Sequence, residues 1–381
     1  MSQPLPTDEE TRRPVPDPGR VLVVGGYGAV GVVTTRALAA AYPGRVIVAG
    51  RDGNKARRAA AGIAGVHAAA LDVTDPAALV DVIERYRVAV VVLAVEPPDS
   101  EATRLCLSRG VHVVDLSASA ALLEQTEQLR GLAHERGATA LLSVGLAPGL
   151  TNLLARRVHD ELGGDADQLD ITVLIGSGER HGADGIRWTV RQLAAPRSRI
   201  DAEPRWVELP GYGRRRAHPF PFSDQHTLRR TLSVAHVATT LCFDSRAATA
   251  LLFGVRRTGL FRAVRGDRGI ELLTKILRGI HVGSDGFAVR VDGRRGSLER
   301  WQAVTGSQQS RVTGLVAAQV TGAILGGRVP TGVHHIDEID DFVHLPERLA
   351  GDGLRVWRAA RPHGRERDLT SSALEGAGSE S

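Results

Sequence analysis

Near its start the chain reads Val21-Leu22-Val23-Val24-Gly25-Gly26-Tyr27-Gly28-Ala29-Val30-Gly31. The apolar run predicts a short buried strand over 20–24, and the glycines predict a tight turn before a helix over 29–41. The glycines can be read as GxxGxxG on residues 25, 28 and 31, or as GxGxxG on residues 26, 28 and 31. We prefer the first reading because the strand ends at Val24.

The same alternation of strand and helix continues through the first third of the chain. An unbroken β-branched run over 88–95 is typical of a strand buried on both faces. Six strands separated by helices predict an α/β fold with a doubly wound parallel Rossmann sheet. The expected strands are 20–24, 45–49, 67–71, 88–95, 111–116 and 139–144, and the expected helices are 29–41, 52–62, 76–86, 100–109 and 120–136.

Each glycine of the turn has a separate task if the turn binds a dinucleotide. Gly25 makes the tight exit from the strand, Gly28 lets the backbone approach a pyrophosphate, and Gly31 lets the helix pack closely. The helix N-terminus offers free N–H groups and a partial positive charge to the phosphates. A glycine turn without a ligand is the alternative, which the strand–turn–helix context disfavours. The expected cofactor-binding residues of the turn are Gly25, Gly26, Tyr27, Gly28, Ala29, Val30 and Gly31.

The end of the second strand distinguishes between the two nicotinamide cofactors. NAD sites place Asp or Glu there for the ribose 2′-OH, whereas NADP sites place Arg there for the 2′-phosphate. Here Arg51 follows the strand, so we expect NADP, with NAD as the alternative; Asp52 can cap the next helix. Asp72, at the end of the third strand, either bonds the adenine or caps the following helix. Val95 lies where the nicotinamide ribose would pass.

The second part of the chain follows a different pattern. After Gly149, strands over 170–175, 205–209, 234–243, 287–291 and 299–304 and helices over 186–194, 246–253 and 272–277 occur in separate runs. This is typical of an α+β domain on a mostly antiparallel sheet. We therefore expect a disordered N-terminal tail (1–19), an NAD(P)-binding Rossmann domain (20–149), an α+β substrate and dimerisation domain (150–305), helices that return to the Rossmann domain (306–360) and a disordered C-terminal tail (361–381).

Composition limits the possible partners. The formal charge of +5 comes from arginines scattered among acids, which favours phosphate-bearing ligands over nucleic acid. Cys106 and Cys242 have no metal-ligand spacing, so we expect buried free thiols in a reducing compartment and no metal. No apolar run approaches the roughly 18 residues that a membrane span needs. We expect a cytoplasmic homo-oligomer, such as a homodimer, that binds a small-molecule substrate and neither nucleic acid nor membrane.

Four stretches of the chain together carry a resemblance to a known family. They are the turn at 25–31, Ala49-Gly50-Arg51-Asp52, Gly110-Val111-His112-Val113-Val114-Asp115-Leu116-Ser117 and Gly145-Leu146-Ala147-Pro148-Gly149-Leu150-Thr151-Asn152. With these stretches the chain resembles the saccharopine dehydrogenase-like family. The resemblance implies a Rossmann domain interrupted by an α+β domain, with the nicotinamide in the cleft between them. It also implies an oxidoreductase that reduces either an imine or a carbon–carbon double bond. Neither Lys55 nor Lys275 matches the acid/base lysine of some members, which argues against the lysine-pathway activity itself.

Candidate residues for chemistry lie first at the carboxyl ends of the strands, where open parallel sheets bind ligands. Asp115 and Ser117 end the fifth strand and can hold the nicotinamide half or position a substrate amine. Alternatively, Asp115 only caps the helix that begins at Ala120. Asn152 begins a helix whose N–H groups can bind a carboxylate or carboxamide, and the alternative is an interdomain hinge with a cap.

The second domain adds three candidates. Arg187 can bind a substrate that carries a carboxylate. Asp224 and His226 can form an acid/base pair near neutral pH, although such residues are more often surface groups at a helix start.

These features predict an NADP-dependent oxidoreductase that reduces an imine or an activated double bond of a small substrate bearing an amine or a carboxylate. One alternative is a non-catalytic redox sensor that binds the dinucleotide. Another is a lyase or synthase that borrows and returns the hydride. The fold supports all three functions, so it does not distinguish them. Net consumption of NADPH separates the reductase from the other two.

Overall fold

The structure is a computed structural model that describes residues 19–179, 183–194, 203–258, 266, 269–271, 283–358 and 367–368. The expected helix at 272–277 and most of the two expected tails lie outside these residues.

The first part of the chain forms a parallel sheet, sheet A, as predicted. Its strand order is β13-β6-β5-β4-β1-β2-β3, and the order from β3 to β6 is that of a dinucleotide-binding Rossmann sheet. The strands are β1 (Arg20–Val24), β2 (Val46–Gly50), β3 (His67–Ala70), β4 (Val88–Leu93), β5 (His112–Asp115), β6 (Thr139–Leu142) and β13 (Gly332–His335). The helices between them are α1 (Ala29–Ala41), α2 (Gly53–Ala61), α3 (Pro76–Tyr86), α4 (Glu101–Ser108), α5 (Ala120–Glu127) and α6 (Arg130–Glu135).

A second, mostly antiparallel sheet, sheet B, confirms the predicted α+β part. Its order is β15-β14-β12-β11-β7-β10-β9-β8, and only β7 and β10 pair in parallel among these described strands. The strands are β7 (Gln168–Ile175), β8 (Arg205–Leu209), β9 (Gly213–Pro219), β10 (His236–Phe243), β11 (Gly286–Arg295), β12 (Leu298–Ser307), β14 (Arg355–Arg358) and β15 (Arg367–Asp368). The accompanying helices are α7 (Thr151–Glu161), α8 (Ala183–Ala194), α9 (Asp224–Thr231), α10 (Arg246–Thr258), α13 (Gln309–Leu325) and α14 (Leu345–Arg348).

Sheet A is buried on both faces because successive side chains of a strand point to opposite sides. Leu22 and Val24 belong to a core cluster with residues of α3, α4 and α6. Val21 and Val23 belong to another cluster that includes residues of α1, α7, α13 and sheet B. One hydrophobic core therefore runs from the Rossmann sheet into the second sheet.

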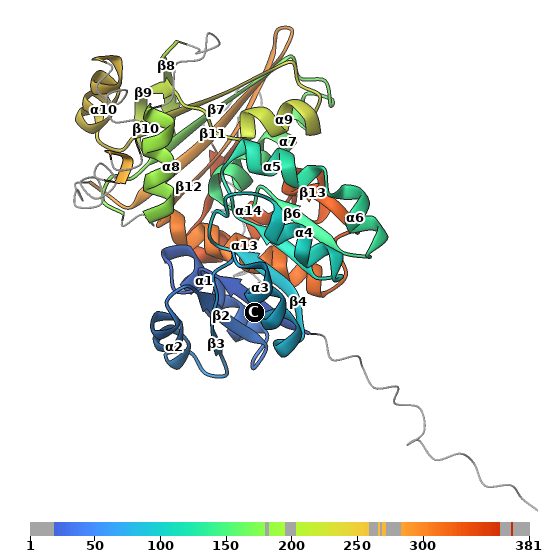
Figure 1. The fold of residues 1–381 in the computed structure, drawn as a ribbon. Coiled ribbons are helices and arrows are strands. Elements are labelled where there is room, and N and C mark those ends of the chain that lie inside the picture. The colour runs from blue at the N-terminus through green and yellow to red at the C-terminus, as the bar shows by residue number, and fades with distance from the viewer. Residues whose placement is uncertain are drawn as a thin grey trace, which may run out of the picture.

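The chain returns to sheet A after completing β12. α13 packs against α1, where the Thr34 hydroxyl donates to the Gly314 carbonyl oxygen at 3.3 Å. Figure 1 shows α13 at the junction of the two sheets. β13 then joins the edge of sheet A beside β6, and β14 joins sheet B. Residues after 305 thus contribute to both sheets.

Several details differ from the sequence prediction, and strands β9 and β15 are among the elements that were not predicted. The expected helix at 120–136 is two helices, α5 and α6, separated by two residues. Strands β13 and β14 were not predicted, because each has only four residues and no apolar run marks it.

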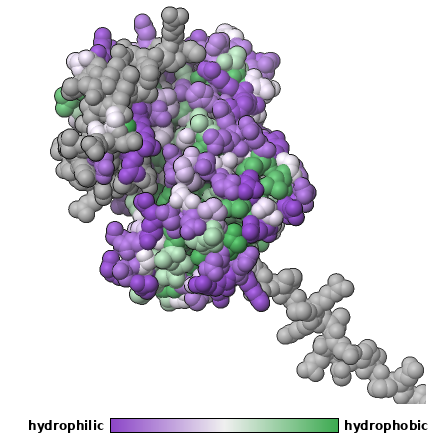
Figure 2. Space-filling model, viewed as in Figure 1, coloured by the Kyte–Doolittle hydropathy of each residue, from purple (hydrophilic) through white to green (hydrophobic). Residues whose placement is uncertain are grey.

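The surface is largely hydrophilic on the face that Figure 2 shows. Large hydrophobic side chains that are exposed among the described residues are Trp206, Leu251 and Leu298. None of the helices in the described part of the chain is long and apolar enough to cross a membrane.

Candidate functional site

The turn after β1 is shaped by two glycines that no other residue could replace. Gly25 has φ +77°, and a Cβ there would lie 2.6 Å from Val95 Cγ1 and 2.8 Å from the Ala94 oxygen. A Cβ on Gly31 would collide with the Gly25 carbonyl oxygen. The first turn of α1 therefore packs directly on the backbone that leaves β1.

Gly28 differs from these two because little surrounds it. It is exposed, and its amide donates to the Gly25 oxygen at 2.8 Å. Apart from its chain neighbours, that oxygen is the only atom of the described residues within 4 Å of an added Cβ, at 3.1 Å. Gly28 is also the N-cap of α1, and no side chain in the described part of the chain caps the helix. The amides of Ala29, Val30 and Gly31 begin the helix and are available to an anion such as a pyrophosphate.

Tyr27 connects the turn to the end of β2. Its hydroxyl accepts a hydrogen bond from the Asp52 amide at 3.2 Å. Its ring lies against Gly50, where a Cβ would be 2.5 Å from Tyr27 Cε1. The turn is therefore fixed relative to Arg51, the residue expected to select the cofactor.

Arg51 and Asp72 lie exposed at the carboxyl ends of β2 and β3. Hydrogen bonds from the Thr74 amide and hydroxyl, with a smaller contribution from the charge of Arg51, lower the pKa of Asp72. Asp75, not Asp72, caps α3 by accepting from the amides of Ala77 and Ala78, so the helix-cap alternative for Asp72 is wrong. Asp52 caps α2, as expected, by accepting from the Lys55 amide.

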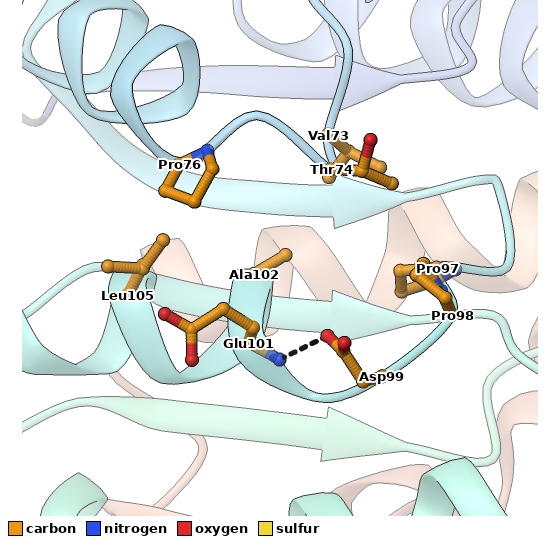
Figure 3. A pocket seen from close by; sticks show the side chains of 9 residues that line it. All are labelled: Val73, Thr74, Pro76, Pro97, Pro98, Asp99, Glu101, Ala102 and Leu105. Carbon is orange, nitrogen blue, oxygen red and sulfur yellow. Dashed lines mark hydrogen bonds between the residues drawn. The ribbon is translucent and has the colours of Figure 1, made fainter.

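A small cavity lies between the loops that follow β3 and β4 (Figure 3). Its volume is about 100 Å³, well below the several hundred Å³ of a site for a whole ligand. Two of its lining residues, Val73 and Pro97, lie close in sequence to Asp72 and Val95, which are both expected to contact the cofactor. Figure 3 shows Val73 and Thr74 on one wall and the two prolines of the β4–α4 loop on another. Its lining residues are Val73, Thr74, Pro76, Pro97, Pro98, Asp99, Glu101, Ala102 and Leu105.

Asp115 and Ser117 lie fully buried at the end of β5. Asp115 Oδ1 accepts from the Ser117 amide at 2.8 Å, but Asp115 Oδ2 and Ser117 Oγ have no hydrogen-bond partner within the described part of the chain. Burial raises the pKa of Asp115, although the nearby Ser117 hydroxyl, the bond from the Ser117 amide and the charge of His335 oppose the rise. Ser119, not Asp115, caps α5 through the Leu122 amide, so the cap alternative for Asp115 is wrong. Two buried polar atoms are thus left for a ligand or water.

Asn152 lies at the start of α7, as expected, but its amide group is committed to other parts of the protein. Its Oδ1 accepts from the Gly149 amide at 3.1 Å, and its Nδ2 donates to Thr227 Oγ1 at 3.2 Å and Asp337 Oδ1 at 3.0 Å. These bonds join three segments that are distant in sequence. A substrate-binding role for Asn152 stays a prediction.

Asp224 and His226 are not brought together. Asp224 is fully buried, its Oδ1 accepts from Thr239 Oγ1 at 2.6 Å, and burial raises its pKa to about 6. His226 is exposed on the same helix, and no hydrogen bond or ion pair links the two within the described residues. Asp224 Oδ2 is buried without a partner in this part of the chain. Asp224 alone keeps the features of a proton-holding group.

Arg187 lies half-buried on α8, beside an aromatic cluster. The neighbouring Trp188 ring packs against Phe220 and Phe222, with ring centroids 5.6 and 5.4 Å away. The Trp188 indole N–H is buried and has no partner among the described residues. The segment that carries Asp224 thus lies next to α8 in the second domain.

Ser143, His335 and Glu127 form a polar array beside the end of β5 that was not predicted from the sequence. Ser143 Oγ lies 2.8 Å from His335 Nδ1, and His335 Nε2 lies 2.9 Å from Glu127 Oε1. Glu127 in turn forms an ion pair with Arg230 of α9. Ser143 and His335 could have been found as polar residues at the carboxyl ends of strands. Glu127 lies on a helix, so this signal would not have found it. The described residues contain no cluster of His, Cys, Asp or Glu able to hold a metal.

The strand order, the uncapped α1 and the glycine turn together define a Rossmann-type dinucleotide-binding domain. Residues 21–141 match the family model described as the saccharopine dehydrogenase NADP binding domain. This part of the chain is therefore an NADP-binding domain of the saccharopine dehydrogenase type, as the resemblance implied, and it supports an NAD(P)-dependent oxidoreductase.

Several solved structures match the chain in part. Dipicolinate-bound dihydrodipicolinate reductase from Paenisporosarcina sp. TG-14 is 11% identical, with a TM-score of 0.40, over 84% of this chain and 98% of that one. A putative betaketoacyl-ACP reductase is 18% identical, with a TM-score of 0.28, over 32% of this chain and 71% of that one. The 3-hydroxyacyl-CoA dehydrogenase type-2 from Mycobacterium avium is 16% identical, with a TM-score of 0.27, over 32% and 73%. No curated protein matches the chain.

Proposed function

We propose that the chain is an NADP-dependent reductase that acts on an imine, or on an activated double bond, of a small substrate. One observation carries the proposal. Asp115 Oδ2 and Ser117 Oγ are buried at the carboxyl end of β5, on the sheet edge that also carries the cofactor turn, and neither forms a well-aligned hydrogen bond among the described residues. An NADP-binding domain with unpartnered polar groups on that edge is typical of a site where a second molecule binds.

The residues at the sheet edge have complementary roles in this proposal. The α1 amides and Arg51 hold the phosphates of the cofactor, which supplies a hydride when bound. Asp115 binds the substrate nitrogen and gives it a proton, so that the C=N bond becomes CH–NH. Its raised pKa suits this role, because a buried carboxyl keeps its proton to a higher pH. Ser117 Oγ donates to the substrate, and Arg187 binds a carboxylate where the substrate has one.

A screen of amine and carbonyl pairs tests the proposal. The protein is incubated with NADPH and each pair, and with a set of activated alkenes, while the absorbance of NADPH is followed. We expect net NADPH consumption with at least one pair, and none when the amine or the carbonyl compound is left out. Tight NADPH binding without consumption across the whole set would instead favour a redox sensor. Product formation without net consumption would favour a synthase or lyase.

A further inference from the structure

The array of Ser143, His335 and Glu127 lies at the sheet edge that carries Asp115. The register pairs Val114 of β5 with Leu141 of β6 and Leu142 of β6 with His335 of β13. Asp115, the next residue after Val114, is therefore opposite Leu142, with His335 on the other side. Side chains at matching positions of neighbouring strands share a face, so Asp115 and His335 flank β6 on one face of sheet A. Ser143 follows Leu142 directly and is fully buried.

The other end of the array reaches solvent. The Glu127 side chain keeps 22% of its exposure, whereas that of His335 keeps 3%. Glu127 lines an open depression of about 500 Å³ together with Glu124, Gln128, Arg130 and Arg230. His335 and Arg230 hold the pKa of Glu127 below its usual value even though burial opposes this. The array is thus a continuous set of proton-bearing side chains from a surface depression to the buried sheet edge.

We propose that Glu127, His335 and Ser143 form a relay that carries protons from solvent to the carboxyl end of β5, where Asp115 lies. The proposal rests on the proposed function, in which Asp115 loses one proton per turnover to the substrate nitrogen. Glu127 first gives a proton to His335 Nε2, which converts the imidazole to an imidazolium. The imidazolium then releases its other proton from Nδ1 to Ser143 Oγ. In the proposed last step, the hydroxyl proton of Ser143 passes to the Asp115 carboxylate, which has given its own proton to the substrate nitrogen, and Glu127 takes up a new proton from solvent. No electrons are transferred in these steps. His335 is then a positioning residue, because it acts through Ser143 and Asp115.

The imidazole has a defined electrostatic surrounding. Glu127 and its partner Arg230 approach His335 from α5 and α9. The Glu338 carboxylate accepts from the His335 backbone amide at 2.7 Å. His134 of α6 lies near Gly332 at the other end of β13. At the sheet edge, the charge of His335 acts on Asp115 and opposes the rise in its pKa that burial causes.

The first experiment needs no substrate. Infrared spectra record the carboxylic acid band of Asp115 as the pH is raised, and the band is assigned by its loss in Asp115→Asn. Because a nearby imidazolium favours the carboxylate, His335→Gln should move the titration of this band to higher pH. His334→Gln is the matched control, since His334 bonds instead to the Thr331 carbonyl oxygen. If both variants titrate as the native protein does, His335 is not coupled to Asp115 and the relay is wrong.

The second experiment uses a substrate found in the screen. Glu127→Gln should lower kcat by about tenfold and enlarge the solvent deuterium isotope effect, whereas KM and NADPH affinity stay unchanged. Glu124→Gln is the control, because Glu124 also contacts Arg230 and no bond joins it to His335 among those described. Glu127 is partly exposed, so its variant should fold even where His335→Gln does not. Equal turnover of the two glutamate variants would overturn the relay while leaving the reductase intact. A protein that never consumes NADPH would contradict the proposed function, and the infrared titration would still decide the relay.

Discussion

We expect Arg51 to select the cofactor without contributing to the stability of the fold. It is exposed at the carboxyl end of β2, beside Asp72 and next to the residue that caps α2. A guanidinium there can form charge-assisted bonds to a 2′-phosphate, which NADP has and NAD lacks.

Arg51→Ala should therefore weaken NADPH binding by about ten- to a hundredfold and leave NADH binding unchanged. Isothermal titration calorimetry with both cofactors measures the difference. Arg57→Ala is the matched control, because Arg57 is also exposed on this side but bonds to Asn54. Equal weakening of both cofactors would mean that Arg51 contacts something other than the 2′-phosphate.

Asp115→Asn keeps the size of the side chain and removes its charge and its proton. It should lower kcat/KM by about two orders of magnitude, with little change in NADPH affinity. Ser119→Ala removes the cap of α5 and should cost about 1 kcal/mol of stability without affecting turnover. Normal turnover by the Asp115 variant would exclude it from the chemistry and make Asp224 the next candidate.

The residue types and their position at the end of a strand were sufficient to select Asp115 and Ser117 from the sequence as candidate site residues. They were not sufficient for the array, because Ser143 and His335 are 192 positions apart and Glu127 is 208 from His335. Such contacts depend on β13 joining β6, which no local pattern indicates. The pairing of Asp224 with His226 was suggested by nearness in sequence, yet one lies buried and the other exposed on the same helix.

At the scale of elements, the unit of β1, turn and α1 combines two kinds of glycine. Gly31 has backbone against its missing side chain, whereas Gly28 faces open space apart from one carbonyl oxygen. Gly31 therefore serves packing, whereas a ligand-binding role for Gly28 stays a prediction. Both roles were predicted because a strand, a glycine turn and a helix in this order are a strong local signal.

The two glycines should respond differently to substitution. Gly28→Val should fold normally and lose NADPH affinity by at least about tenfold, because its side chain occupies the space of the pyrophosphate. Gly31→Val should lower the unfolding temperature, because the Gly25 backbone cannot move aside. Thermal unfolding and calorimetry on both variants check this. Unchanged NADPH binding in folded Gly28→Val would remove the phosphates from this turn.

Other elements were harder to predict. The long apolar run of β4 marks its position plainly, whereas β13 and β14 have four residues each and alternate poorly. Both become strands only because the edges of the two sheets offer backbone partners. Tertiary pairing, which a single sequence does not display, therefore decides these elements.

At the scale of the whole molecule, one hydrophobic core joins the two sheets. The protonation of a buried acid in either part therefore changes the unfolding free energy of the whole protein. Asp224 is fully buried and has a pKa of about 6, above the ordinary value of 3.8. The native state thus binds this proton more tightly than the unfolded chain does. The resulting stabilisation is complete below the ordinary pKa and is lost as the pH rises through about 6.

Wild-type protein should therefore lose about 2 kcal/mol of unfolding free energy from this group between about pH 4 and pH 7. Asp224→Asn should lack this component, so its stability relative to wild type should rise with pH. Urea unfolding of both proteins at both pH values measures the change. A parallel pH profile for Asp224→Asn and wild type would show that Asp224 does not titrate in this range.

In the proposed function, the NADP site and the buried groups at the end of β5 serve reduction of a bound substrate. Hydride transfer from NADPH deuterated at C4 on one face, followed by mass spectrometry of the product, tests this. We expect one deuterium on the reduced carbon for each NADPH oxidised when the label is on the transferred face. We also expect Asp115→Asn to form this product about a hundredfold more slowly. NADPH that binds but transfers no deuterium to any imine or activated alkene would rule out the proposed reductase.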